Sequence, residues 1–118
     1  MEKMYFNTRD ELVAVDFERV AVIQANGNYT RIIYINKHEV MLSMGINKVG
    51  EMLARHQQLA KAFYRIGRSC IVHHKYFERI DIQRQFIVLS DLDTNEIRLK
   101  VSKPLLKAYK NGLTGKSE

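Results

Sequence analysis

The strongest chemical signal in this sequence is one arginine in a short polar break between two apolar segments. Arg68 stands between Gly67 and Ser69, after the apolar segment 63–66 and before the apolar residues 71–72. Because both neighbours have the composition of β-strands, the break predicts a tight loop that exposes the guanidinium group. An arginine held in this way can donate two hydrogen bonds to guanine. The alternative role is an ion pair, for which the candidate partners are Glu78 and Asp81.

A second group of cations accompanies the helix that the sequence predicts near the end of the chain. Ser102 has a residue type that caps helices, and Pro104 follows where its missing N–H costs little. The free N–H groups at such an end can also bind phosphate, so capping and an anion contact are compatible. Lys103 can contact a base or a phosphate, or cover apolar surface with its stem. Lys107 and Lys110 either attract phosphates or are only solvated.

The positive charge of the chain is concentrated in its second half. The 19 Lys and Arg residues exceed the 13 Asp and Glu residues, which gives a net charge of +6. Residues 1–51 carry six basic and seven acidic side chains, whereas residues 52–118 carry thirteen and six. The segments 52–77 and 97–117 contain no acidic residue. This distribution predicts a positive face that follows phosphates, and the alternative is a basic surface that only improves solubility.

The residues that serve in catalysis or metal binding lack the required spacing. His73 and His74 are adjacent, so on a strand their side chains point to opposite faces and cannot bind one metal ion together. We expect both to lie at the surface or to face a phosphate. The apolar neighbours of Cys70 favour a buried thiol over a nucleophile. Asp91 and Asp93 fall in a predicted turn, where we expect both carboxylates to be solvated. From all of these residues together, the sequence predicts neither an enzyme nor a bound metal or cofactor.

The length of the chain, 118 residues, is that of one domain. We expect the domain to span residues 1–113, followed by a polar tail at 114–118. One cysteine excludes an internal disulfide, and no apolar run approaches the roughly 20 residues that a membrane-spanning helix needs. Since the N-terminus also lacks the apolar core of a secretion signal, we expect a cytoplasmic protein.

Short runs of β-branched and aromatic residues, separated by turn residues, predict a mostly β fold. The expected strands are residues 4–8, 11–16, 20–24, 29–35, 39–42, 63–66, 71–72, 80–82, 86–89 and 96–101. The segment 20–42 is typical of a three-stranded meander. Two short helices are expected, the first at 43–56 with Ser43 as its cap and the second from Ser102 to Gly112.

Three segments carry motifs that are similar to those of one family. Residues 22–30 read Val-Ile-Gln-Ala-Asn-Gly-Asn-Tyr-Thr, similar to a strand, a Glu-Ala-x-Gly-Asn-Tyr turn and a second strand. Residues 63–73 read Phe-Tyr-Arg-Ile-Gly-Arg-Ser-Cys-Ile-Val-His, similar to Phe-x-Arg-Ile-His-Arg-Ser-x-Ile-Val-Asn. Residues 99–103 read Leu-Lys-Val-Ser-Lys, similar to Leu-x-Val-Ser-Arg. In order and spacing the chain resembles the LytTR DNA-binding domains of bacterial transcription regulators, from about residue 4 to residue 112.

The resemblance implies an elongated arrangement of small antiparallel sheets with two short helices. It also implies that loops, rather than a recognition helix, enter successive major grooves of double-stranded DNA. The residues that match the family's contact positions are Asn28, Tyr29, Thr30, Arg31, Arg68, Ser69, Ser102 and Lys103. The expected DNA-binding set is completed by Arg65, His73, Lys107 and Lys110.

The resemblance further implies a transcription regulator that binds paired repeats as two copies. Members of the family often follow a receiver domain, but we expect none here and therefore a stand-alone regulator. The sequence departs from the family at Gln24, Gly67, His73 and Lys103, where the family has Glu, His, Asn and Arg. These departures bear on which DNA sequence is recognised rather than on DNA binding itself.

Other roles stay open for several residues and for the whole chain. Asn28 is either a turn residue with positive φ or a contact, and Tyr29 packs either in the core or on the sugar-phosphate backbone. Arg31 and Arg65 either bind phosphate or lie on solvated strand faces. The alternative functions are an RNA or single-stranded nucleic-acid binder, which needs an aromatic stacking surface, and a basic module that binds an acidic protein.

Overall fold

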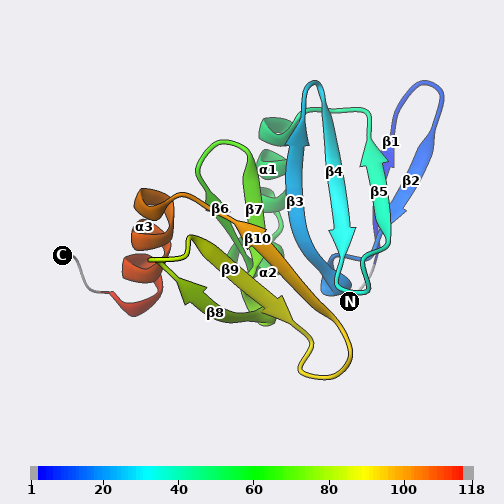
Figure 1. Ribbon diagram of the computed structural model, residues 1–118. Coiled ribbons are helices and arrows are strands. Elements are labelled where there is room, and N and C mark those ends of the chain that lie inside the picture. The colour runs from blue at the N-terminus through cyan, green and yellow to red at the C-terminus, as the bar shows by residue number, and fades with distance from the viewer. Residues whose placement is uncertain (1–2, 116–118) are drawn as a thin grey trace.

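The runs of β-branched and aromatic residues form short strands that pair into antiparallel sheets (Figure 1). The computed structural model describes residues 3–115. A two-stranded hairpin comes first, with strands β1 (Met4–Asn7) and β2 (Leu12–Val15). A five-stranded sheet has the order β5–β4–β3–β7–β6, and its strands are β3 (Val20–Asn26), β4 (Tyr29–Tyr34), β5 (Glu39–Leu42), β6 (Phe63–Ile66) and β7 (Cys70–His73). A three-stranded sheet consists of β8 (Phe77–Asp81), β9 (Phe86–Ser90) and β10 (Glu96–Lys100).

Three α-helices and two 3-10 helices connect these sheets within residues 3–115. They are α1 (Ile46–Arg55), α2 (Gln57–Ala62), α3 (Lys103–Thr114), η1 (Phe17–Arg19) and η2 (His74–Tyr76). Helix α1 buries Ile46, Val49 and Leu53, which lie on one face because they are three and four residues apart. It packs against β3 and β4, whereas α3 contacts β6 and β8 at the other end of the molecule (Figure 1).

The five-stranded sheet is the middle layer between two hydrophobic clusters. On one face, residues such as Ile23 and Leu53 form a cluster with the N-terminal hairpin, α1 and α2. On the other face, residues such as Val22 and Leu106 form a cluster with the three-stranded sheet and α3. Because consecutive residues of a strand point to opposite faces, Val22 and Ile23 enter different clusters. Strand β3 is thus buried on both sides and forms a rigid support for the loops at its ends.

The molecule is elongated, with principal extents of 46 × 29 × 27 Å. The predicted mostly β fold of small antiparallel sheets is confirmed, as is the three-stranded meander formed by β3, β4 and β5. In the described residues, 3–115, no helix is long and apolar enough to cross a membrane. The three sheets follow one another along the chain, so the loops between them come from well-separated parts of the sequence.

The helices differ from the prediction in number and in their ends. The structure has three α-helices among residues 3–115 rather than the expected two, because residues 57–62, for which the sequence predicted no element, form α2. The N-cap position of α1 is Gly45 rather than Ser43, which lies in the bend before it. Helix α3 continues past Gly112 to Thr114, where Gly115 adopts a left-handed φ of +70°. The other residues of the predicted tail, 116–118, lie outside the described residues.

Candidate nucleic-acid interface

The loop between β6 and β7 has the form that the sequence predicts. Gly67 adopts a φ of +69°, a conformation that only glycine reaches without strain, and the three residues 67–69 form the turn. Arg68 and Ser69 are both exposed. The backbone N–H of Ala25 donates to the carbonyl of Ser69 at 2.9 Å, which ties the loop to β3. The guanidinium of Arg68 is therefore carried by a loop that is fixed to the central strand.

Gly67 also lets the loop approach the start of α3. A Cβ atom on this residue would lie 2.9 Å from Cδ1 of Leu105, which is closer than side chains pack. The close neighbour of Gly67 in the structure is therefore α3. The contact places the Arg68 loop beside the start of α3, although more than thirty residues separate the two in the sequence.

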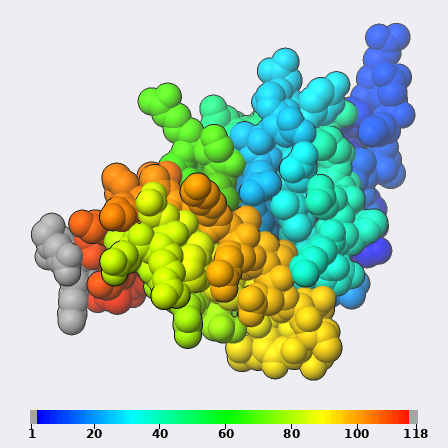
Figure 2. All heavy atoms as spheres, in the orientation of Figure 1, coloured from blue at the N-terminus to red at the C-terminus, as the bar shows by residue number. Residues whose placement is uncertain are grey.

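A groove with a volume of about 380 Å³ joins these two regions. Its lining comes from β3, the β6–β7 loop, the end of β10 and the start of α3, and includes Gln24, Arg68, Ser69, Ser102 and Leu105. Figure 2 shows the β6–β7 loop, in green, rising from the surface between the tip of the β3–β4 hairpin and the orange start of α3. Three of the predicted contact residues thus share one surface hollow.

The start of α3 presents polar and cationic groups to solvent. Ser102 occupies the N-cap position, and its carbonyl accepts from the N–H of Leu106 at 3.0 Å. Within the described part of α3 and its cap, the Ser102 side chain makes no capping hydrogen bond. Lys103, Lys107 and Lys110 are exposed and lie on one face, because their spacing is four and three residues. A lysine in the first turn opposes the helix dipole, and a bound anion would relieve that conflict.

The tip of the β3–β4 hairpin exposes part of the third predicted region. The positive φ of this turn, +61°, falls on Gly27, so Asn28 does not need that conformation. Asn28 is exposed, and Tyr29 is 51% exposed, so of the two alternatives for Tyr29 the one in which it packs in the core is wrong. Arg31 lies further along β4, where its Nε is 3.3 Å from Oε1 of Glu39 on β5. Asn28 and Tyr29 are the residues of this region that solvent reaches most freely.

Two predicted contact residues are buried, and their assignment is corrected. Thr30 is fully buried, and its hydroxyl donates to the carbonyl of Met44 at 2.8 Å. His73 is 3% exposed, and its Nδ1 lies 2.8 Å from the carbonyl of Val20. Neither side chain faces a surface that DNA can reach. Both stabilise the five-stranded sheet instead, Thr30 from β4 and His73 from β7.

Arg65 makes contacts that neither of its two predicted roles, phosphate binding and a solvated strand face, includes. Its guanidinium is bent back onto the β6–β7 loop, where it donates to the carbonyls of Gly67 and Arg68. A third hydrogen bond reaches Oδ1 of Asn47 on α1. The side chain is exposed, but its hydrogen bonds are directed at the protein rather than at solvent.

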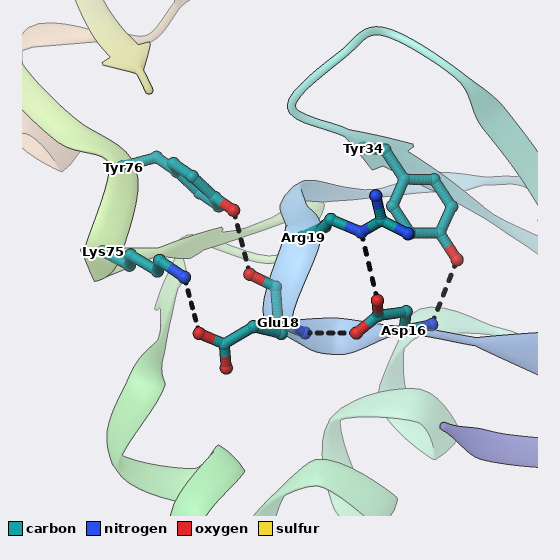
Figure 3. A network of polar contacts seen from close by, with 6 residues as sticks. All are labelled: Asp16, Glu18, Arg19, Tyr34, Lys75 and Tyr76. Carbon is teal, nitrogen blue, oxygen red and sulfur yellow. Dashed lines mark hydrogen bonds and ion pairs between the residues drawn. The ribbon is translucent and has the colours of Figure 1, made fainter. Parts of the chain in front are cut away.

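The opposite ends of β3 and β7 are held by the polar network of Figure 3. The Lys75 ammonium pairs with the Glu18 carboxylate, and the Tyr76 hydroxyl donates to the Glu18 carbonyl at 2.9 Å. The N–H of Glu18 donates to Asp16, whose own N–H donates to the Tyr34 hydroxyl. The network joins η1, η2 and β4. It therefore fixes β3 relative to β7 at the ends remote from the Arg68 loop.

Buried His73 predicts that the protein loses stability in mild acid. Burial lowers the pKa of His73 below 6.5, more than the hydrogen bond to Val20 and the charge of Glu18 raise it. The charges of Lys75 and His74 lower it further. Between the pKa of the folded state and about 6.5, the unfolded chain therefore binds more protons than the folded chain. The free energy of unfolding falls as the pH drops through this range.

This prediction is checked by urea unfolding at several values between pH 7.5 and 5.5, where most carboxylates stay ionised. His73→Asn removes the titrating group and is expected to make the free energy of unfolding depend less on pH. Part of the pH dependence should remain, because burial also lowers the pKa of His74. A wild-type stability that is constant over this range would contradict the assignment of His73 as a neutral buried residue.

Several groove residues were not recognised as candidates from the sequence. Gln24 was noted only as a departure from the family, and Cys70 only as a buried thiol, yet both line the groove beside Arg68. Their proximity follows from the pairing of β3 with β7, in which Gln24 lies opposite Cys70. Burial raises the pKa of the Cys70 thiol to about 11, so it stays protonated at neutral pH. Gln24 and Cys70 could be recognised as groove residues only from the pairing of β3 with β7, which the sequence pattern does not reveal.

The comparisons with known proteins identify the family and the fold of this chain. The model of the LytTr DNA-binding domain family matches residues 10–114. The structure is similar to a solved LytTr DNA-binding domain assigned to a methyl-accepting/DNA response regulator of Bacillus cereus. The TM-score is 0.65 at 20% identity, over 98% of this chain and 99% of that chain. The sequence matches no curated protein. Because the family model covers most of the residues, including all three contact regions, this chain belongs to the LytTr DNA-binding domain family.

Proposed function

We propose that this domain is a sequence-specific regulator of transcription that binds double-stranded DNA through loops placed in the major groove. One observation carries the proposal: Arg68 and Ser69 share a groove with Ser102, at the start of the lysine-bearing helix α3. Arginine reads guanine, whereas serine hydroxyls, lysines and helix N-termini suit phosphates. The same surface therefore holds one group that can discriminate between bases and several that can position the duplex.

The distribution of ion pairs supports an anionic partner at this surface. The four ion pairs found among residues 3–115 involve Arg19, Arg31, Lys75 and Arg84. Neither Arg68 nor the three lysines of α3 belong to this group, and Asp81, one candidate partner of Arg68, pairs with Arg84 instead. Their charges are thus not neutralised by a carboxylate of the described chain. Phosphates are the natural counterions for such a cluster.

The shape of the molecule supports contact along more than one turn of DNA. Its longest extent of 46 Å exceeds the roughly 34 Å repeat of the duplex. We infer that the hairpin tip at Asn28 and the Arg68 loop approach different parts of the major groove. All three predicted contact regions belong to this domain, so we propose that it binds DNA without a receiver domain. We further propose that two copies bind to paired repeats.

The proposal is tested by titrating the protein against four nucleic acids. These are a duplex selected from a random-sequence library, an unrelated duplex, the corresponding single strand and an RNA of the same sequence. We expect the selected duplex to bind most tightly, and about six phosphate contacts would give a slope of roughly −5 to −6 for log K against log salt. Tighter binding of single strands or RNA, or an affinity insensitive to salt, would overturn the proposal.

Replacing Lys107 and Lys110 by alanine should weaken binding to the selected and the unrelated duplex equally. Contacts to phosphate position the protein but carry no information about base sequence. Loss of two such contacts should also reduce the salt slope by about 2. Competition assays at several salt concentrations measure both effects. If the double variant instead preferred a different DNA sequence, α3 would contact bases and the docking proposed here would be wrong.

A further inference from the structure

The side chain of Arg65 forms a compact set of hydrogen bonds around the Arg68 loop. Its Nε donates to the carbonyl of Gly67 at 3.2 Å, and its Nη2 donates to the carbonyl of Arg68 at 2.6 Å. The second hydrogen of Nη2 is directed at Oδ1 of Asn47, at 2.8 Å. Three of the five N–H bonds of the guanidinium are thus used, and two of them end on the loop that carries Arg68.

The contact with α1 fixes the guanidinium from outside the loop. Asn47 lies in the first turn of α1, whose buried face packs against the five-stranded sheet. Gly50, one turn further along α1, lies close as well: a Cβ placed on it would be 3.6 Å from Nη1 of Arg65. The guanidinium therefore lies between a helix anchored in the core and a loop that has left the β-ladder. This arrangement transfers the rigidity of α1 to the loop.

We propose that Arg65 is a positioning residue for Arg68: by binding two successive loop carbonyls and Asn47, it holds the loop in the conformation that reads DNA. The inference rests on the proposed function, because it assumes that Arg68 contacts a base. It replaces the phosphate contact that the sequence left open for Arg65. A planar guanidinium suits this role, because it can donate to several acceptors in fixed directions, whereas an ammonium is a flexible point charge.

The variant Arg65→Lys separates positioning from phosphate binding. A lysine keeps the positive charge and can still bind a phosphate, but it cannot reproduce the planar set of hydrogen bonds. We expect Arg65→Lys to bind the selected duplex about tenfold more weakly, the order of effect of one lost charge-assisted hydrogen bond. Binding to the unrelated duplex and the salt slope should match the wild type. Wild-type affinity for the selected duplex would overturn the proposal.

Asn47→Ala tests the anchor without changing any charge. We expect a loss of affinity for the selected duplex in the same direction as for Arg65→Lys. In the double variant Arg65→Lys, Asn47→Ala the two losses should not add, because both residues act through one set of hydrogen bonds. Arg79→Lys is the matched control, since it makes the same exchange at an exposed arginine of β8. Additive losses, or a loss as large in the Arg79→Lys control, would count against positioning.

Backbone amide exchange in the free protein tests the same idea without DNA. If Arg65 orders the loop, then Arg65→Lys and Asn47→Ala should speed exchange in residues 67–70, while β3 and α1 keep their protection. Unchanged exchange in the loop would overturn the positioning role. If the wild type failed to distinguish the selected from the unrelated duplex, the proposed function would fall. The exchange data would still decide whether Arg65 orders the loop.

Discussion

Arg68→Ala should abolish most of the discrimination between the selected and the unrelated duplex. Removing a bidentate contact to guanine should lower affinity for the selected site by about 1–3 kcal/mol. The loss on unrelated DNA should be much smaller, because one charge leaves a protein with a net charge of +6. Competition binding of the two duplexes measures the difference. The thermal stability should not change, since Arg68 is exposed and belongs to none of the ion pairs of residues 3–115.

Arg79→Ala serves as the control for Arg68→Ala, because it removes the same charge from an exposed position on β8. It should reduce affinity for both duplexes slightly and equally. If Arg68→Ala lowered the melting temperature by many degrees yet kept the discrimination, Arg68 would be a structural residue. Base reading would then move to Asn28 or Lys103, because buried Thr30 cannot take part.

Leu106→Ala should have the largest effect on stability among the variants considered. Leu106 is fully buried in the cluster that joins α3 to the three-stranded and five-stranded sheets. Truncating a buried leucine typically lowers the free energy of unfolding by about 2–5 kcal/mol, because it removes apolar contacts and leaves a cavity. Chemical denaturation measures this loss. Since Leu106 holds α3 in place, DNA binding should weaken as well, through displacement of Ser102 and Lys103.

Leu113→Ala provides the control on the same helix. Its side chain is 42% exposed, so the substitution should change stability by no more than about 0.5 kcal/mol. Equal effects of the two leucine variants would contradict the placement of α3 against the core. A stable Leu106→Ala protein with unchanged DNA affinity would show that α3 contributes nothing to the interface.

The strands and the turns at Gly27 and Gly67 could be predicted from the sequence because their signals are local. Turn residues such as Gly27 and Gly67 separate runs of β-branched residues, and both glycines adopt the positive φ that such turns require. Arg68 and Ser102 are exposed at the ends of secondary structure elements, as expected. Here the conformation depends on neighbours in the chain, so pattern and structure agree.

The misassigned residues depend on pairing between distant segments. His73 is buried because β7 lies between β3 and β6 in the sheet, with cores on both faces, so a strand residue has no solvent face there. Thr30 lies on the same face of β4 as buried Ile32, a two-residue spacing that indicated burial despite its polar type. The hydrogen bonds of Arg65 to the loop, made from β6, could be recognised only once the fold placed Asn47 of α1 beside it.

Amide exchange of the protein in complex with the selected duplex shows whether three separate regions contact DNA. We expect hydrogen-exchange protection on binding to concentrate at the β3–β4 tip, at residues 67–70 and around Ser102 and Lys103. The turn at 91–95 should not change. Protection confined to the N-terminal hairpin or to the 91–95 turn, with no change near Arg68, would rule out binding through these three regions.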